Sequence, residues 1–344
     1  MKNYIQLKSL NTFSIDVCAK HVVTVHNECA LLKFWKKADN KGQPVLILGD
    51  GSNILFLENY IGTILLNRIK GIFITENKMT WRIHVGAGEK WHELVTYTIN
   101  KNIPGLENLA YIPGYVGAAP IQNIGAYGVE LSQICEYVDV IDLYNEKKIR
   151  FFHAECNFQY RDSIFRNCLK KYAIVSVGLK LNKKWKPVLD YHELIHLNKN
   201  RVTPRQVFNF INIIRRKKLP DPMSVGNAGS FFKNPVVDIN IARCLFQIYP
   251  NMPYYSQKDG KIKLLAGWLI ERCHLKGCVF GEAAIYSKQS LVLINRRKIA
   301  TGTEIAALAL FIYNQVADKF NVYLQPEVRL IGNYGEISPK KLFI

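Results

Sequence analysis

Two glycine-rich segments contain the residue types that could bind an anionic or a flat ligand. The first is the turn GDGSN, formed by Gly49, Asp50, Gly51, Ser52 and Asn53. Glycines reach positive φ and lack a Cβ, so backbone N–H groups in such a turn can converge on phosphate oxygens. The turn is a candidate pyrophosphate cradle, although purely structural turns between strands have this composition more often.

The second segment is IPGYVGAAPIQNIGAYG, residues 112–128. This density of glycine and proline excludes a stable helix. A loop of this kind lets the backbone approach the edge of a flat ligand closely, with amide groups available for ring nitrogens and carbonyls. By composition alone, a ligand-binding loop and a ligand-free structural loop are equally good interpretations.

Apolar periodicity predicts the elements that position these segments in the first part of the chain. Short strands are expected at residues 45–48, 54–57, 63–66 and 81–85. Apolar residues at helical spacing predict a helix over 91–99 that ends before Pro104 and Gly105. This part of the chain is therefore expected to be rich in sheet.

Strands and helices are also expected in the rest of the chain. The hexapeptide FQYRDS, residues 158–163, lies between expected strands at 137–144 and 172–181. Thr203 and Pro204 are a favourable N-cap and first-turn pair, and the prolines of LPDP should end that helix. The remaining elements predict a compact α+β unit, with helices over 265–275 and 303–320 and a strand at 291–294.

Length and charge limit the class of protein. A chain of 344 residues exceeds the usual size of one hydrophobic core, so two or three packed units are expected. The formal net charge of +19 suggests nucleic-acid binding, but the basic residues occur in short clusters with no basic tail or known motif. A compositional bias towards Lys, Asn and Ile explains the charge better, and no specific nucleic-acid partner is expected.

The cysteines and the apolar segments indicate a reduced, soluble protein. Eight cysteines are scattered through the chain, which favours reduced thiols, and Cys273, His274 and Cys278 match no common zinc spacing, so no metal is expected. The longest apolar stretch, residues 305–313, is well below the roughly 20 residues that span a bilayer. The N-terminus lacks the apolar core of a secretory signal, so a cytoplasmic protein without membrane association is expected.

Ten motifs, in their expected order, resemble the UDP-N-acetylenolpyruvoylglucosamine reductase family over nearly the whole chain. They are NTF (residues 11–13), LGDGSNILF, VGAGEKWHELV, the run at 112–128, FQYRDSIF, KLPDP, GNAGSFFKNP, AGWLIE, KQSLVLIN and LQPEVRLIG. The resemblance implies an α+β fold, with a two-part FAD-binding domain (vanillyl-alcohol-oxidase/PCMH-like) and a C-terminal α+β substrate-binding domain.

The same resemblance implies four segments. They are FAD-binding subdomain 1 at 1–70, FAD-binding subdomain 2 at 71–218, a substrate-binding domain at 219–325, and a C-terminal segment at 326–344 that returns to the active site. A tyrosine loop near Tyr191, within KPVLDYHEL, resembles the loop that the longer subclass of these reductases folds over bound substrate.

The resemblance also implies the reaction. The family transfers a hydride from NADPH to noncovalently bound FAD, and then to UDP-N-acetylglucosamine enolpyruvate, which becomes UDP-N-acetylmuramate for peptidoglycan synthesis. This would place the chain in cell wall biogenesis, cell shape, the cell cycle and cell division. Flavin would supply the hydride chemistry, and the protein must stabilise the enolate-like charge and provide a proton.

Residue by residue, the resemblance implies three catalytic positions. Ser230 in GNAGSFFKNP would donate the proton, and Arg161 in QYRDS would hold the substrate carboxylate and the developing enolate. Glu327 in LQPEVRLIG would place the reacting group. The implied substrate contacts are Tyr191, Lys218, Asn234 and Gln289.

The implied cofactor contacts lie in the two glycine-rich segments. They are Gly49, Asp50, Gly51, Ser52, Asn53, Pro113, Gly114, Gly117, Ala118, Ala119, Asn123, Gly125, Ala126 and Gly128. Ala118 and Ala119 stand where some members have serines, and Asp50 where others have glutamate, so individual hydrogen bonds to FAD can be lost while backbone contacts survive.

Two other functions compete with the reductase. A related FAD-dependent oxidase of a small or sugar substrate would have no use for the UDP-binding residues, and many such oxidases attach flavin through a His or Cys with no evident counterpart here. A basic nucleic-acid-binding protein would not require Arg161, Ser230 and Glu327 together. The chain is expected to act as a monomer on small-molecule substrates.

Overall fold

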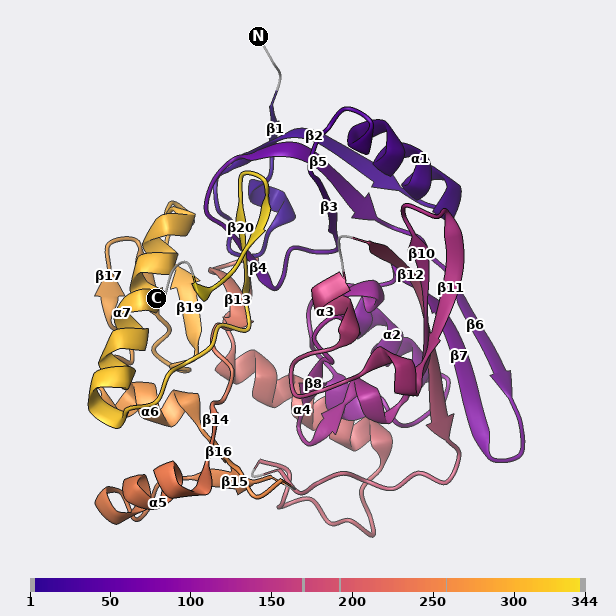
Figure 1. Ribbon diagram of the computed structural model, residues 1–344. Coiled ribbons are helices and arrows are strands. Elements are labelled where there is room, and N and C mark those ends of the chain that lie inside the picture. The colour runs from indigo at the N-terminus through magenta and orange to yellow at the C-terminus, as the bar shows by residue number, and fades with distance from the viewer. Residues whose placement is uncertain (1–3, 169–170, 192, 258, 341–344) are drawn as a thin grey trace. The chain divides into compact units, whose positions relative to one another are not determined.

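The computed structural model describes residues 4–168, 171–191, 193–257 and 259–340, and the chain forms two compact units (Figure 1). The terminal unit comprises Met1–Lys20, Gly51–Ile61 and Lys218–Ile344, and the central unit comprises His21–Asp50 and Gly62–Lys217. Residues 341–344 of the expected C-terminal segment lie outside the described residues.

The central unit is built on a five-stranded antiparallel sheet in the order β11-β10-β12-β7-β6 (Figure 1). Its strands are β6 Ile72–Glu76, β7 Thr80–Gly86, β10 Cys135–Asp142, β11 Lys147–Phe152 and β12 Tyr172–Asn182. Side chains alternate across a strand, so Ile83 and Val85 of β7 are buried while His84 between them lies on the opposite face. The buried face packs on one large core that includes Trp91 and Leu109.

Shorter elements complete this unit. They are α1 Glu28–Asp39, β3 Val45–Leu48, α2 Trp91–Asn100, β8 Gly125–Ala126, β9 Val129–Glu130, α3 Ile164–Cys168 and α4 Pro204–Lys218, whose last residue is assigned to the terminal unit. The 3-10 turns are η2 Glu107–Leu109, η3 Val116–Ala118, η4 Leu131–Gln133 and η5 His153–Cys156. α1 buries Leu31 and Trp35 in a second core with Leu65 and Val175.

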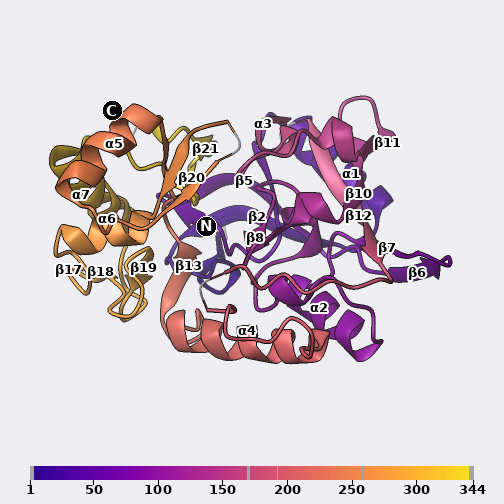
Figure 2. The same cartoon turned by 90° about the horizontal axis from the view of Figure 1, so that it is seen from below.

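Helices α2 and α4 lie side by side (Figure 2). Arg205 Nη2 donates to the carbonyl oxygen of Ile99 at 3.2 Å, and the rings of His92 and Phe208 stack at 5.9 Å. Thr203 caps α4, because its Oγ1 accepts from the N–H of Gln206 and its own N–H donates to the Gln206 side chain. The structure therefore confirms the helix start predicted at Thr203 and Pro204.

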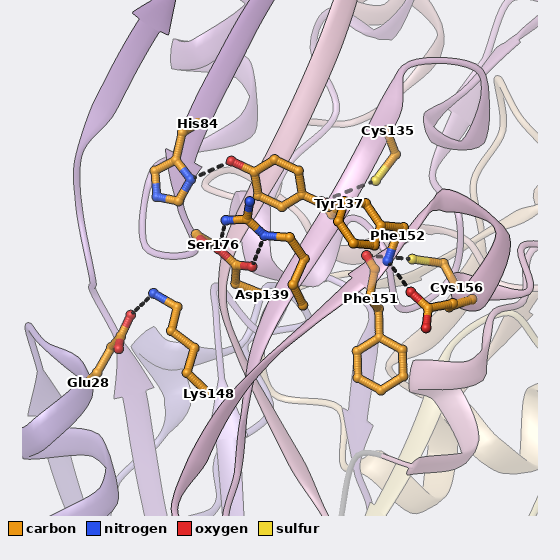
Figure 3. A network of polar contacts seen from close by, with 12 residues as sticks. Glu28, His84, Cys135, Tyr137, Asp139, Lys148, Phe151, Phe152, Cys156 and Ser176 are labelled. Atoms are coloured by element: carbon orange, nitrogen blue, oxygen red, sulfur yellow. Dashed lines mark hydrogen bonds and ion pairs between the residues drawn. The ribbon is translucent and has the colours of Figure 1, made fainter.

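A polar network lies on the face of the five-stranded sheet that carries His84, opposite the main core (Figure 3). Arg150 donates two hydrogen bonds to the buried carboxylate of Asp139, at 2.7 and 2.9 Å, and Ser176 Oγ donates a third at 2.9 Å. The Arg150 guanidinium also stacks 3.6 Å from the ring centroid of Tyr137, whose hydroxyl bonds His84. Burial alone would raise the pKa of Asp139, but the hydrogen bonds from Arg150 and Ser176 outweigh burial and hold that pKa below its usual value.

Asp139→Asn is expected to lower the free energy of unfolding by about 2 kcal/mol at neutral pH, because it removes charge-assisted hydrogen bonds to Arg150. A carboxyl group with a lowered pKa stabilises the fold above its unfolded pKa, and this contribution disappears as pH falls through the folded pKa. Denaturant unfolding at several pH values should therefore show the difference shrink in acid. Asp16→Asn, which touches only an exposed pair with Lys8, is the control. An unchanged difference down to strongly acidic pH would contradict the explanation.

Among its described residues, the terminal unit contains three small sheets and three helices. Its strands are β1 Ile5–Gln6, β4 Ile54–Phe56, β13 Gly226–Ser230, β14 Val236–Val237, β15 Tyr254–Ser256, β16 Ile262–Leu264, β17 Val279–Phe280, β18 Ala283–Ile285, β19 Val292–Asn295, β20 Arg329–Gly332 and β21 Gly335–Ile337. Its helices are α5 Ile239–Ile248, α6 Ala266–Arg272 and α7 Gly302–Phe320, with the 3-10 turn η1 Lys8–Leu10. The unit boundary falls within β2 Cys18–Val25 and β5 Tyr60–Asn67, and β5 pairs in parallel with β3.

The NTF motif organises the core of the terminal unit. The buried Asn11 side chain donates to the carbonyl oxygens of Leu7 and Ile15 and accepts from the Ile15 N–H. Asn295 Nδ2 donates to the carbonyl oxygen of Phe13 at 3.0 Å, which connects the N-terminal turn to β19. This motif therefore has a structural role.

The structure confirms the elements expected from periodicity, with shifted ends. The helix expected over 265–275 is shorter, because the backbone turns left-handed at His274. The helices α1, α3 and α5 were missed. The seven cysteines whose side chains the structure describes are free thiols. Within the described ranges, no helix is long and apolar enough to cross a membrane, and no group of three His, Cys, Asp or Glu residues could hold a metal ion.

Candidate functional site

The glycines of the central unit allow backbone segments to pack directly on one another. A Cβ at Gly117 would lie 2.6 Å from Ala87 Cβ, and one at Gly88 would lie 2.3 Å from the carbonyl carbon of Arg68. Such distances are well below van der Waals contact, so side chains cannot be accommodated there. The loop at 112–128 therefore packs against the turn that follows β7. The backbone N–H of Trp91 donates to the carbonyl oxygen of Gly114, and the backbone N–H of Val116 donates to the carbonyl oxygen of Glu89.

Arg68 and Tyr115 join the two glycine-rich segments within the central unit. The Arg68 guanidinium lies 4.2 Å from the Tyr115 ring centroid and donates from Nη2 to the carbonyl oxygen of Gly49 at 3.1 Å. A Cβ at Gly49 would be 3.4 Å from Tyr115 Cδ2. A cation therefore lies beside the turn that is expected to bind pyrophosphate, and Arg68 is a site candidate that sequence reasoning missed.

Glycine has a different role at Gly51, which belongs to the terminal unit. Its φ is +61°, in the left-handed region that favours glycine. A Cβ there would lie 2.3 Å from the carbonyl oxygen of Leu10. Packing against the N-terminal turn thus accounts for this glycine without a ligand.

Several backbone amides of the run at 112–128 are already used inside the protein. The N–H groups of Gly117, Ala118 and Ala119 donate to the carbonyl oxygens of Ala87, Tyr115 and Val116. Ala119 is buried, whereas Ala118 is exposed. Neither alanine carries a hydroxyl group, so the surface that the exposed Ala118 side chain contributes is apolar.

Asn123 holds the run in shape. It is almost fully buried with φ +44°, and its Nδ2 donates to Glu130 Oε2 at 2.9 Å and to the Gln159 carbonyl oxygen at 3.1 Å. Its Oδ1 accepts from the Ser132 N–H at 2.9 Å. The side chain therefore connects the run to the segment that carries Arg161.

Arg161 projects from a tight turn onto the glycine-rich run. Gln159 and Asp162 exchange backbone hydrogen bonds, and Arg161 between them adopts φ +53°, an uncommon conformation for a residue with a side chain. Its Nη2 donates to the carbonyl oxygen of Gly125 at 2.7 Å. A Cβ at Gly125 would lie 3.1 Å from Arg161 Nη1, so glycine permits this close approach.

Arg215 of α4 lies close enough to Arg161 for their charges to interact. Burial lowers the pKa of Arg215 from its ordinary value, and the positive charge of Arg161 acts in the same direction. Arg215 Nε donates to the carbonyl oxygen of Tyr111 at 3.1 Å. The Tyr191 and Tyr127 rings meet edge to face at 5.2 Å, and both tyrosines lie in the neighbourhood of Arg215. Two cations and two tyrosines therefore gather beside the run.

In the terminal unit, Ser230 ends β13 after an irregular pairing with β19. Gly229 has φ +70°, and its N–H donates to Asn227 Oδ1 at 3.0 Å. The buried Asn227 also donates from Nδ2 to the carbonyl oxygens of Pro220 and Val225. A buried amide thus fixes the turn that presents the half-buried Ser230.

The backbone brings Glu327 next to Ser230. The Glu327 N–H donates to the carbonyl oxygen of Phe231 at 2.7 Å, one residue beyond Ser230. Asn53 Nδ2 donates to the Glu327 carbonyl oxygen at 3.3 Å, and the Asn53 carbonyl oxygen accepts from the Arg329 N–H. The structure therefore places Ser230, Glu327 and Asn53 on adjoining segments of one unit.

Asn234 and Gln289 lie together at the start of α6. Asn234 Oδ1 accepts from the Ala266 N–H at 3.0 Å, and Gln289 Oε1 lies 3.5 Å from the position of a Cβ on Gly267. Lys218, the last residue of α4, is half-buried. The expected site residues therefore form one group in the terminal unit and another, with Arg161 and Tyr191, in the central unit.

Comparisons with known proteins identify the two parts of the chain. Residues 19–150 match the FAD binding domain, and residues 221–331 match the C-terminal domain of UDP-N-acetylenolpyruvoylglucosamine reductase. The solved UDP-N-acetylenolpyruvylglucosamine reductase from Thermus caldophilus has a similar fold, with a TM-score of 0.64 at 22% identity over 95% of this chain and 98% of that one. The expected α+β fold with an FAD-binding domain is confirmed.

Curated relatives are much closer in sequence. The UDP-N-acetylenolpyruvoylglucosamine reductase of Blochmanniella pennsylvanica is 80% identical over 98% of both chains, and that of Blochmanniella floridana is 64% identical over both full lengths. The Escherichia coli enzyme is 54% identical over 96% of this chain and 97% of its own. The chain therefore belongs to the UDP-N-acetylenolpyruvoylglucosamine reductase family of FAD-dependent oxidoreductases.

Proposed function

We propose that this chain uses NADPH and FAD to reduce the enolpyruvyl group of UDP-N-acetylglucosamine enolpyruvate, giving UDP-N-acetylmuramate. The observation that carries the proposal is the pair of guanidinium groups, Arg161 and Arg215, held beside the glycine-rich run. Guanidinium groups attract and hydrogen-bond carboxylates, so two of them beside the run would suit the carboxylate of the substrate.

The residues of the central unit fit FAD. Backbone segments meet there without side chains at Gly88 and Gly117, and the exposed Ala118 lies on the same run. We propose that the run, with Pro113, Gly114, Gly125, Ala126 and Gly128, lies against the flavin ring, and that Gly49 to Asn53 with Arg68 hold the pyrophosphate. Bound FAD would supply hydride transfer between NADPH and the enolpyruvyl group.

We propose that Arg161 stabilises the charge that develops on the substrate. When a hydride reaches the terminal enolpyruvyl carbon, negative charge accumulates on the neighbouring carbon and its carboxylate. A guanidinium group presents paired N–H donors that match a carboxylate. The hydrogen bond to Gly125 and the turn at Gln159 and Asp162 hold Arg161 in place before the charge appears.

Ser230 and Glu327 complete the proposed reaction. The Ser230 hydroxyl donates a proton to the carbon that bears the new charge, and Glu327 helps to place the reacting group. The positive φ of Gly229 and the Asn227 hydrogen bonds fix the position of Ser230. The contact between Glu327 N–H and Phe231 O keeps the glutamate on the adjoining segment.

The other proposed contacts involve the nucleotide sugar. Asn234 and Gln289, at the start of α6, and Lys218 would bind the nucleotide sugar and its phosphates, and Tyr191 would cover the bound substrate. The basic surface would attract both anionic substrates electrostatically. We further propose a cytoplasmic monomer that acts in peptidoglycan precursor synthesis, and thereby in cell division, without a specific nucleic-acid partner.

The purified protein is expected to bind FAD noncovalently and to oxidise more than one equivalent of NADPH per bound flavin only when the enolpyruvyl substrate is present. The measurement combines a titration with added FAD and a spectrophotometric assay with and without substrate. A protein that binds no FAD would contradict the cofactor assignment. NADPH oxidation that depends on dioxygen instead of the enolpyruvyl substrate would favour the oxidase.

A further inference from the structure

Residues 183–202, here called the strap, connect β12 to α4 without a regular helix or strand among the described residues. The strap carries Tyr191, one of the proposed substrate contacts. Leu189 and Leu194 on either side of this tyrosine are buried in the main core of the central unit. A segment with so little regular structure needs specific contacts to hold one conformation.

The first such contact is made by Glu107 in η2. This almost fully buried carboxylate accepts from the indole N–H of Trp185 at 2.6 Å through Oε1. Its Oε2 accepts from the Gly105 N–H at 2.7 Å. Glu107 therefore fixes the beginning of the strap to the turn that follows α2.

The second contact is made by the neighbouring residue, Asn108. Its buried Nδ2 donates to the carbonyl oxygen of Val188 in the strap at 2.9 Å. The same nitrogen donates to the carbonyl oxygen of Tyr127 in the glycine-rich run at 2.8 Å. Since an amide nitrogen carries two N–H donors, one side chain uses both to join the strap to the run.

The Asn108 bridge determines where Tyr191 lies. Tyr127, whose carbonyl oxygen Asn108 binds, also packs its ring edge to face against Tyr191 at 5.2 Å. Val188, the other partner of Asn108, is three residues before Tyr191 in the strap. Main-chain and side-chain contacts therefore fix the same two segments relative to each other.

We infer that Asn108 is a positioning residue for substrate binding, because it holds the strap on the glycine-rich run so that Tyr191 is presented to the UDP substrate. Both N–H donors of Asn108 are used on Val188 and Tyr127, so its proposed effect on the substrate passes through these two residues. The inference rests on the proposed function of Tyr191, and it adds the residue that makes this tyrosine effective.

The kinetic test compares Asn108→Ala with Tyr191→Ala in the FAD-loaded enzyme. Asn108→Ala is expected to raise KM for the enolpyruvyl substrate about tenfold, the usual effect of losing buried hydrogen bonds, and to leave KM for NADPH within about twofold. If Asn108 acts through Tyr191, the double variant should have the KM of Tyr191→Ala alone. The inference would be overturned if the two substitutions raised KM for the enolpyruvyl substrate multiplicatively in the double variant. It would also be overturned if Asn108→Ala raised KM for NADPH as much as KM for the enolpyruvyl substrate.

A second measurement needs neither flavin nor substrate. The strap contains the exposed trypsin sites Lys184, Lys199 and Arg201, and Asn108→Ala should increase tryptic cleavage there several-fold. Asn212→Ala is the matched control, because its Nδ2 makes a comparable side-chain bond to Phe208 O within α4. Cleavage at the wild-type rate in Asn108→Ala would overturn the inference even if the enzyme is active.

A milder variant tests the same inference if Asn108→Ala fails to fold. Trp185→Phe keeps an aromatic ring but removes the N–H that binds Glu107. It should raise strap cleavage and KM for the enolpyruvyl substrate in the same direction as Asn108→Ala, by a smaller factor. Increased cleavage with an unchanged KM in both variants would show that the strap position does not serve substrate binding, and would also contradict the inference.

Discussion

Ser230→Ala is expected to slow reduction of the enolpyruvyl group by about 10²–10⁴-fold, the usual contribution of a general acid. The substitution removes the proposed proton donor and leaves the turn intact, because Asn227 and Gly229 hold that turn through their own hydrogen bonds. Bleaching of the flavin absorbance by NADPH should proceed at the wild-type rate. The two half-reactions must therefore be measured separately by rapid mixing.

The control for this prediction is Ser224→Ala, which replaces an exposed serine of the same unit. It should leave both half-reactions unchanged. Equal slowing of the two half-reactions by Ser230→Ala would show that the residue supports the fold or the cofactor, and would contradict its role as the acid.

Arg161→Ala is expected to reduce kcat/KM for the enolpyruvyl substrate by about 10²–10³-fold, the range observed when a preorganised donor to developing charge is removed. Arg161→Lys should recover only part of this loss, because an ammonium group lacks the paired N–H donors that match a carboxylate. The expected decrease appears mainly in kcat, since charge develops during the reaction. Steady-state kinetics with the enolpyruvyl substrate varied at saturating NADPH provides the measurement.

Arg205→Lys is the matched control for Arg161, because Arg205 is an exposed arginine of the same unit that also donates to a carbonyl oxygen. Its kinetics should equal those of the wild type. Full activity in Arg161→Lys would show that only a positive charge is needed, which would refute the proposed bidentate contact.

The sequence was sufficient to predict elements with a strong local pattern. The strand at 45–48 and the helix that starts at Thr203 and Pro204 were correct, because apolar alternation, capping and proline act over a few residues. α1 was missed although Asn27 caps it and Leu31, Trp35 and Ala38 recur at helical spacing on its buried side, so both the cap and the periodicity were usable signals.

Long-range partners could not be predicted from local patterns. The sequence marks Arg161 by its motif, yet nothing near it indicates that Arg215 or Gly125 lies alongside. A usable signal existed for Arg215, which continues the buried stripe of Val207 and Ile211 at helical spacing. Asn108 gave no comparable signal, because a single asparagine in a turn is common and its two partners are distant in the chain.

For the glycine-rich run, too, composition predicted a local property but not the hydrogen bonds that depend on packing. Its composition predicts a loop with close backbone contacts, and the structure shows such contacts at Gly117 with Ala87. The composition could not reveal that the N–H groups of Ala118 and Ala119 are already bonded within the protein. Those hydrogen bonds depend on a turn geometry that is set by the packing of η3 on the sheet.

The most direct test of the central claim is an anaerobic rapid-mixing experiment on the wild-type protein loaded with FAD. One equivalent of NADPH is added to bleach the visible flavin absorbance, and the protein is then mixed with UDP-N-acetylglucosamine enolpyruvate. The flavin absorbance is expected to return at a rate that increases with substrate concentration, and one equivalent of UDP-N-acetylmuramate is expected to form. Absorbance that stays bleached with the substrate and returns only when dioxygen is admitted would contradict the central claim.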